Sequence, residues 1–280
     1  MDDATDFDLI SGVGEDLAKS HVKGHMRGTH YVKPYDRQGG PHHPEPHHHP
    51  KMDDDGKKVL IKEPHHPSHE STWHEPDAVA TFVPGGDCPA RLNGVSFTKW
   101  RDHPTTTEGW DYLDLVNDEL DEPPFKPQPG KSIGAGVVIR EPDGRVWVTH
   151  PTNKFGGYSG TLPKGTADPE LSLQANAIRE AWEETGLKVR IVGFVGDFNR
   201  TTSVARMYLA ERVGGTPSEM GWESQGLSLV PPSHLYDHLN GWSDHPIAEA
   251  IGAGPAPKKP ELPPAPTGQQ PHFGGLFGKK

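Results

Sequence analysis

The chain has 280 residues, of which only 32% are hydrophobic, and it contains 33 glycines and 30 prolines. This composition favours one domain with a single core and disordered flanks over two average domains. The net charge of −11 argues against a general attraction to nucleic acid or to an anionic membrane, and the single cysteine, Cys88, excludes an intramolecular disulfide. An acidic N-terminus and the absence of a long apolar run predict a cytoplasmic protein.

The first third of the chain, residues 1–92, has the composition of a linker rich in histidine, proline and glycine, and it holds 12 of the 18 histidines. Within it, residues 21–37 alternate basic or polar and apolar side chains and predict a small basic hairpin. The histidine cluster has two interpretations. It is a solvated spacer, which the alternating prolines favour, or a segment that stores or delivers a metal such as zinc.

Residues 93–129 are expected to form a helical lead-in and a proline-rich connector, with ordered structure beginning near Asn93. The helix is indicated by apolar residues at helical spacing, namely Trp110, Leu113, Val116 and Leu120. The proline-rich stretch after it cannot be helix or central strand, so we expect an extended connector.

Residues 130–252 carry the signals of a folded domain. Two valine-rich runs in residues 134–151, separated by Pro-Asp-Gly, predict a β-hairpin. Further strands are predicted at 189–198, 203–213 and 226–231, with a short helix after the last one. Residues 253–280 are rich in proline and predict an extended, disordered tail.

A strong helix is predicted within residues 162–189, where Ser172 or Asp168 can cap the start and Gly186 suits the end. With Glu180 at zero on a helical wheel, Glu184 falls at about 40° and Glu183 at about 300°. The opposite side is apolar, so we expect the three acids to face outward while the other face packs on a sheet.

Three carboxylates on one side of a helix repel one another unless a cation lies between them. A hard divalent cation such as Mg²⁺ prefers oxygen ligands, keeps several waters and takes its remaining ligands from phosphate. Taken alone, the pattern of acids is also typical of a solvated helix face. The residues around it decide between the two interpretations.

The string from Gly165 through Arg179, Glu180, Glu183 and Glu184 to Gly186-Leu187 resembles the Nudix box, G-x5-E-x7-R-E-U-x-E-E-x-G-U, at all but one of its most diagnostic positions. The resemblance implies an α/β fold, a Nudix-type α/β/α sandwich with a mixed sheet, over residues 130–252. It also implies a loop-helix-loop that binds Mg²⁺ or Mn²⁺.

One position departs from this pattern, because Leu171 occupies the place of the first box glutamate, with Asp168 and Glu170 nearby but out of register. In the family that glutamate supports the arginine and the metal ligands, so weaker metal binding is expected.

The resemblance assigns roles to the matching residues. Metal ligands would be Glu180, Glu183, Glu184 and the carbonyl of Gly165, and Arg179 would orient Glu180. Beyond the box, Glu223 is the candidate for a general base or an extra metal ligand, and Glu219 is the second choice. The alternative is that both are ordinary turn residues.

Residues that contact substrate are indicated more weakly. The candidates are Lys164 and Arg206 for phosphate and Tyr158 for a base, with Phe155, Trp222 and Arg200 as further candidates, and each of them is also typical of packing or of a solvated surface.

The leading hypothesis is a divalent-metal-dependent Nudix hydrolase that cleaves a pyrophosphate bond in a nucleoside diphosphate linked to another moiety, such as ADP-ribose or a dinucleoside polyphosphate. The alternative is a catalytically impaired Nudix domain that binds a nucleotide. The expected partner is a small-molecule nucleotide, with no nucleic acid and no membrane, and a homodimer is compatible with the resemblance.

Overall fold

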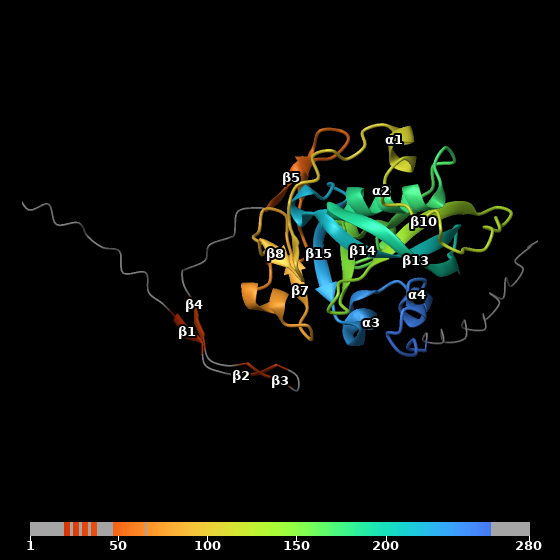
Figure 1. Cartoon of the computed structure of the whole chain (residues 1–280). Coiled ribbons are helices and arrows are strands. Elements are labelled where there is room, and N and C mark those ends of the chain that lie inside the picture. The colour runs from red at the N-terminus through yellow and green to blue at the C-terminus, as the bar shows by residue number, and fades with distance from the viewer. Residues whose placement is uncertain are drawn as a thin grey trace, which may run out of the picture. The chain divides into compact units, whose positions relative to one another are not determined.

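The computed structural model describes residues 47–64 and 66–258, together with four short strands within residues 20–37 (Figure 1). The chain divides into two compact units, Met1–His47 and His48–Lys280. In the first unit, β1 (Ser20–Val22) pairs antiparallel with β4 (Tyr35–Arg37), and β2 (His25–Arg27) pairs antiparallel with β3 (His30–Val32). The segment for which the sequence predicts a hairpin therefore contains two antiparallel strand pairs.

Two sheets form the centre of the second unit. The larger has the order β12-β10-β14-β13, and the smaller, which is antiparallel, has the order β11-β15-β7. In the larger sheet β10 and β14 are parallel and the other pairs are antiparallel, so the sheet is mixed. The strands are β7 (Ala80–Phe82), β10 (Ser132–Ile139), β11 (Val146–Pro151), β12 (Lys164–Thr166), β13 (Leu187–Asn199), β14 (Ser203–Gly215) and β15 (Ser224–Val230).

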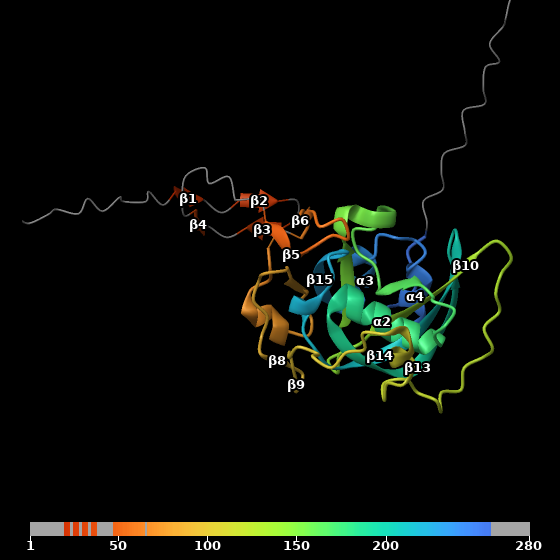
Figure 2. The same cartoon turned by 90° about the horizontal axis from the view of Figure 1, so that it is seen from above.

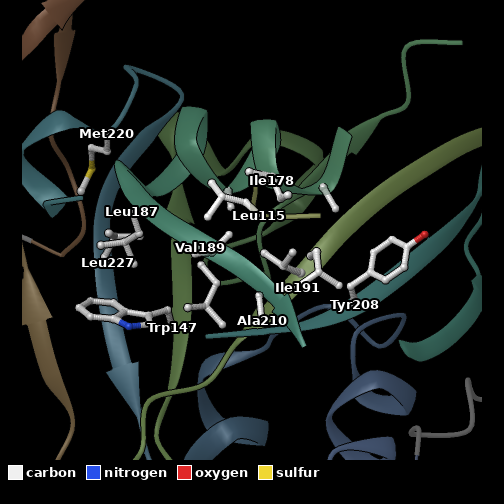
Figure 3. Close-up of a cluster of buried hydrophobic side chains, with 14 of the residues drawn as sticks. Leu115, Trp147, Ile178, Leu187, Val189, Ile191, Tyr208, Ala210, Met220 and Leu227 are labelled. Atoms are coloured by element: carbon white, nitrogen blue, oxygen red, sulfur yellow. The ribbon is translucent and has the colours of Figure 1, made fainter. Parts of the chain in front are cut away.

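Helices cover both sides of these sheets, with α2 (Leu173–Thr185) on one side and α3 (Leu235–His238) and α4 (His245–Ala250) on the other (Figures 1 and 2). Because side chains alternate along a strand, Val137 and Ile139 pack in the core beneath α2, while Val138 packs in the core beneath α3 and α4. Figure 3 shows Ile178 of α2 above Ile191 of β13. The predicted α/β/α sandwich with a mixed sheet is confirmed.

Helix α2 begins and ends where the sequence indicates. The Ser172 side chain accepts a hydrogen bond from the amide of Ala175, so Ser172 and not Asp168 is the cap. At the other end Gly186 has φ 69°, a left-handed conformation that favours glycine. Between these caps, α2 places Glu180 and Glu184 against β12.

The hairpin predicted at 134–151 is wrong in its pairing, although both strands exist. Only the bridge between Arg140 and Val146 joins them, and β10 and β11 then enter different sheets. The Pro-Asp-Gly turn forms, since the Gly144 amide donates to the Glu141 carbonyl at 2.9 Å. The apolar residues on both faces of these strands belong to two separate cores, and a two-stranded pairing would not bury them.

Ordered structure begins well before Asn93, contrary to the sequence-based expectation. The elements between residues 48 and 96 are β5 (His48–Met52), β6 (Lys58–Leu60), the 3-10 helix η1 (Glu70–His74), β7, β8 (Arg91–Leu92) and β9 (Val95–Ser96). Phe82 and Trp73 are buried in the core, and β7 pairs with β15. Histidine and proline dominate the composition here, but a few large apolar residues anchor the segment.

The predicted helical lead-in is mostly irregular. Only α1 (Thr107–Asp111) is helical, and the chain from there to β10 makes turns and extended stretches. Trp110 is buried against Trp100, with ring centroids 5.8 Å apart. Short 3-10 helices complete the unit: η2 (Thr152–Gly157), η3 (Pro217–Glu219) and η4 (Pro232–His234). The spacing of apolar residues therefore reports burial here and not a continuous helix.

Most of the tail predicted at 253–280 lies outside the described residues. In the part of the chain that the structure describes, no helix has the length and apolar character needed to cross a bilayer.

Candidate active site

Two of the three box glutamates, Glu180 and Glu184, lie on the side of α2 that faces β12. A Cβ atom added to Gly165 of β12 would overlap the carboxylate of Glu180, so Gly165 provides the space that this carboxylate occupies. One turn on, the Glu184 carboxylate accepts a hydrogen bond from the backbone amide of Lys164 at 3.3 Å. The outward orientation expected for all three acids is therefore right only for Glu183, which is exposed.

Burial and mutual repulsion raise the proton affinity of this cluster. Burial, and then the charge of Glu183, raises the pKa of Glu180 to about 7. Burial also raises the pKa of Glu184 to about 8, with Glu180 adding to the rise and Lys164 opposing it. Partial desolvation by its surroundings raises the pKa of Glu183, and Glu223 adds to the rise while Arg179 opposes it. These shifts are what uncompensated negative charge in a partly dry site produces.

Glu223 joins the cluster from a different element, the turn just before β15. Its charge raises the pKa of all three box glutamates, which places it within electrostatic reach of each of them. The fallback residue Glu219 has other partners, because its carboxylate pairs with Lys99 at 2.7 Å. Of the two glutamates considered beyond the box, the structure brings Glu223 to the site.

The chemistry of this donor set fits a hard divalent cation, since four carboxylates supply oxygen ligands and excess negative charge. Within the described residues, however, no group of three or more histidine, cysteine, aspartate or glutamate side chains is close enough together to coordinate an ion as it stands. Glu183 and Glu223 are exposed, so their carboxylates have the freedom to turn toward Glu180 and Glu184. The site therefore has the ligands for a metal but not a preformed coordination sphere.

Arg179 does not hydrogen-bond to Glu180 in the way expected. Its guanidinium donates to Asp168 at 3.4 Å and to the side-chain oxygen of Asn176 at 3.2 Å. Leu171, at the position of the missing glutamate, is instead buried in the core with 7% exposure. An out-of-register aspartate thus contacts the box arginine, and the charge of Arg179 acts on Glu180 from a distance.

Asn176 holds Asp168 in this position and was missed by the sequence analysis. It is fully buried, and its amide donates to the carbonyls of Asp168 and Ser172 at 3.0 Å each, while its oxygen accepts from the Asp168 amide. A completely buried asparagine in the first turn of a helix needs such partners. Its placement on the same side of α2 as Arg179, three residues earlier, was the available signal.

Lys164 points away from the pocket and into the interior. Its ammonium group donates to Thr161 and to the Leu162 carbonyl and lies 3.5 Å from Asp244, which has no exposed surface. Burial lowers the pKa of Lys164, and Asp244 opposes that change. This geometry argues against the expected phosphate contact and gives Lys164 a structural pairing close to Glu184.

Arg200 completes this buried group around Asp244. Its guanidinium donates to Asp244 at 2.5 Å and to the hydroxyl of Tyr158 at 2.6 Å, and it lies over the Tyr158 ring. Tyr158 is therefore engaged with Arg200, and its ring is also 5.3 Å from the Lys164 ammonium. These contacts tie the loop after β11 to α4, which argues against the base-stacking role expected for Tyr158.

Arg206, which the sequence predicts to bind phosphate, is engaged by other side chains of the protein. Its guanidinium makes two hydrogen bonds of 2.8 Å to Asp197 and one of 2.9 Å to Glu122, and only 4% of its side chain is exposed. It lines a separate cavity near the N-terminus of α2, bounded by residues other than the box glutamates. A guanidinium so fully paired has little capacity left for phosphate.

A pocket of about 300 Å³ opens beside the acid cluster, and its walls include Glu183, Glu223, Trp182 and Trp222. The pocket is large enough for part of a small ligand and lies next to the acid cluster.

The sequence of this chain matches a family model and several known proteins. The NUDIX domain model matches residues 130–250. A MutT-like protein of Streptomyces ambofaciens is 30% identical over 126 residues, which cover 43% of this chain and 77% of that protein. An uncharacterized Nudix hydrolase of Rhodococcus erythropolis is 31% identical over 125 residues, covering 35% and 68% of the two chains. The solved MutT protein from Methanosarcina mazei Go1 is 18% identical with a TM-score of 0.36, covering 43% of this chain and 92% of its own. This chain belongs to the Nudix hydrolase family.

Proposed function

We propose that this protein is a divalent-metal-dependent hydrolase that cleaves a pyrophosphate bond in a nucleoside diphosphate linked to another moiety, such as ADP-ribose or a dinucleoside polyphosphate. The observation that carries the proposal is the gathering of Glu180, Glu183, Glu184 and Glu223 from two elements into mutual electrostatic reach beside Gly165. Such a concentration of acids is unfavourable by itself, and it becomes favourable when a cation and a phosphate group share the site.

The residues that would hold Mg²⁺ or Mn²⁺ are Glu180, Glu183 and Glu184, with the Gly165 carbonyl as a further oxygen ligand. When bound, the ion supplies polarisation of the phosphoryl oxygens and a lower pKa for a coordinated water. Glu223, which is exposed and lines the pocket, would accept a proton from the attacking water. Arg179 stabilises the charged forms of Glu180 and Glu183 and so favours ligation.

The alternative is a Nudix domain that binds a nucleotide without cleaving it. Two observations favour it. Leu171, which is buried in the core, stands where the box has a glutamate, and no three acids in the described residues are close enough together to coordinate an ion. The carboxylate of Asp168, in contact with Arg179, supports the hydrolase instead.

Turnover decides between the two. Phosphate or mononucleotide release is measured from ADP-ribose, dinucleoside polyphosphates and nucleoside triphosphates with Mg²⁺ or Mn²⁺. Glu183→Gln should lower turnover at least about a hundredfold, because even the groups that support metal ligands are worth ten- to hundredfold. Glu249→Gln, an exposed change on α4, is the matched control and should leave turnover unchanged. Equal background rates in the wild type and Glu183→Gln would reject hydrolysis and leave binding as the function.

The proposal includes a cytoplasmic setting, where nucleotides are abundant, and a small-molecule partner. A homodimer stays a part of the proposal to be tested by the mass of the protein in solution.

A further inference from the structure

The pocket beside the acid cluster has a wall that comes from outside the family-matched region. Residues 130–250 match the NUDIX domain, yet Lys51 and Asp54 of the β5–β6 hairpin (His48–Leu60) line the pocket together with Trp182 of α2 and Trp222. The β5–β6 hairpin is therefore a local addition to the site.

Specific hydrogen bonds fix this hairpin to the turn before β15. The Trp222 indole nitrogen donates to the Asp54 carboxylate at 3.1 Å, and the Lys51 ammonium donates to the Glu219 carbonyl at 2.5 Å. Just beyond the hairpin, the Lys62 amide donates to the Gln225 side chain at 2.9 Å. Three contacts spaced along one segment hold the wall in register with the residues that surround Glu223.

The charges in the pocket favour an uncharged group over a phosphate. Its lining contains the acids Asp54, Glu183, Glu219 and Glu223 and the single cation Lys51, and Lys99 from outside the lining pairs with Glu219 at 2.7 Å, so the acids remain in excess. The ammonium of Lys51 is already bonded to a carbonyl. Carboxylates repel phosphate but accept hydrogen bonds from hydroxyl and amino groups. We therefore expect a phosphate to bind at the acid cluster together with the divalent cation, and an uncharged group that donates hydrogen bonds to bind in the pocket.

The aromatic residues of the pocket indicate which kind of uncharged group it would bind. The Trp182 ring is supported from behind by Trp100 and His103, with centroid distances of 5.4 and 4.8 Å, so its position is fixed. Trp222 is partly exposed and is oriented by its bond to Asp54. Indole rings stack on flat heterocycles with little dependence on sequence or substituent. A volume of about 300 Å³ suits a group the size of a nucleoside.

We propose that this pocket binds the nucleoside of the substrate, with its base against Trp222 and its hydroxyl or amino groups donating to Asp54, so that the β5–β6 hairpin determines specificity. This inference rests on the proposed function for the position of the diphosphate at the adjoining acids. It assigns the selection of the nucleoside to a segment that precedes the family domain.

The test measures binding by the full chain with isothermal titration calorimetry, using the common nucleoside 5′-monophosphates and inorganic pyrophosphate, each with Mg²⁺. Trp222→Ala should weaken binding of the preferred nucleoside monophosphate by about five- to a hundredfold, the range of base–aromatic stacking. Its affinity for pyrophosphate should stay unchanged. Trp222→Phe should restore much of the loss, and Tyr112→Ala, an aromatic with 88% exposure elsewhere, is the matched control.

Asp54→Asn is the second variant, because Asp54 is exposed on the hairpin and its replacement leaves the core intact. It should weaken nucleoside binding while the thermal midpoint stays at the wild-type value. The proposal is overturned if the wild type binds none of the nucleoside monophosphates, or if both Trp222→Ala and Asp54→Asn keep wild-type affinity. Nucleoside binding that depends on Trp222 without any turnover would reject the hydrolase and keep the pocket assignment.

Discussion

Replacing Gly165 with alanine tests whether the space at β12 exists for the Glu180 carboxylate. A Cβ at this position would overlap that carboxylate, which would have to move by roughly 1.2–1.7 Å to restore an ordinary contact of about 3.5–4.0 Å. Gly165 is not in a left-handed conformation, so its backbone accepts alanine. The variant therefore displaces one proposed metal ligand and changes little else.

Stability and activity should separate in this variant. Alanine at a compatible backbone position stabilises by about 0.4–1 kcal/mol through the unfolded chain, and moderate overpacking costs about 1–3 kcal/mol. The displaced atoms belong to the end of a flexible side chain, so we expect the free energy of unfolding to fall by less than about 2 kcal/mol. A displacement of about 1 Å in a reacting geometry costs about a hundredfold in rate, and we expect that loss in kcat/KM.

The assay pairs urea unfolding with turnover at saturating Mg²⁺ on whichever substrate the panel identifies. Gly193→Ala is the matched control, since a Cβ there would make an ordinary 3.5 Å contact with Leu209. It should change neither quantity substantially. If Gly165→Ala retained full activity, or if its activity fell only in proportion to its folded fraction, the space beside Gly165 would have no role in placing Glu180.

Three further predictions concern the groups around the site. In metal-free protein the thermal midpoint should fall as pH rises from about 5 to 8. The reason is that the folded chain holds protons on Glu180 and Glu184 up to about 7 and 8, while the unfolded chain releases them near 4.5. Mg²⁺ should oppose the fall, and a thermal midpoint that does not change with pH in EDTA would contradict the pKa shifts. Asp168→Ala should lower kcat/KM about ten- to hundredfold by releasing Arg179, whereas Glu170→Gln in the same loop should not, and equal rates for the two variants would remove Asp168 from the site. Glu141→Gln should lower the free energy of unfolding by about 3–5 kcal/mol in urea titrations, because it leaves the buried Arg212 charge without its carboxylate partner; a loss below about 1 kcal/mol would show that this pair does not anchor the fold.

The sequence predicts those parts of the fold that depend on local chemistry. The caps at Ser172 and Gly186 set the limits of α2 because each satisfies backbone groups within a few residues of itself. The strands at 187–199 and 203–215 follow from their apolar and β-branched residues, and the box glutamates come together because one helix carries them. Strand pairing does not follow from local sequence in this way. The sequences of β10 and β11 suit a hairpin, but each strand pairs with strands that are distant in the chain.

Contacts between distant residues also explain what the sequence analysis missed at the site. Asp168 contacts Arg179, and the hydrogen bonds of Asn176 to the Asp168 backbone hold the loop against α2. Asp244 lies 80 residues from Lys164 in sequence and still determines where its ammonium points. Neither relation has a spacing that a single sequence displays, so the sequence does not show that the Lys164 ammonium is engaged by Asp244.

The segment before the NUDIX region, which has the composition of a linker, is also ordered by contacts with distant residues. Buried arginines of the NUDIX region donate hydrogen bonds to backbone carbonyls within residues 72–92. Arg145 donates to the carbonyls of Thr72, Trp73 and Ala78, and Arg212 donates to that of Leu92 at 2.9 Å. Backbone carbonyls are present in every segment whatever its composition, so composition cannot reveal such anchors. The part of this segment that lines the pocket beside Glu183 is likewise held by contacts with distant residues, since Asp54 accepts a hydrogen bond from Trp222 and Lys51 donates to the Glu219 carbonyl.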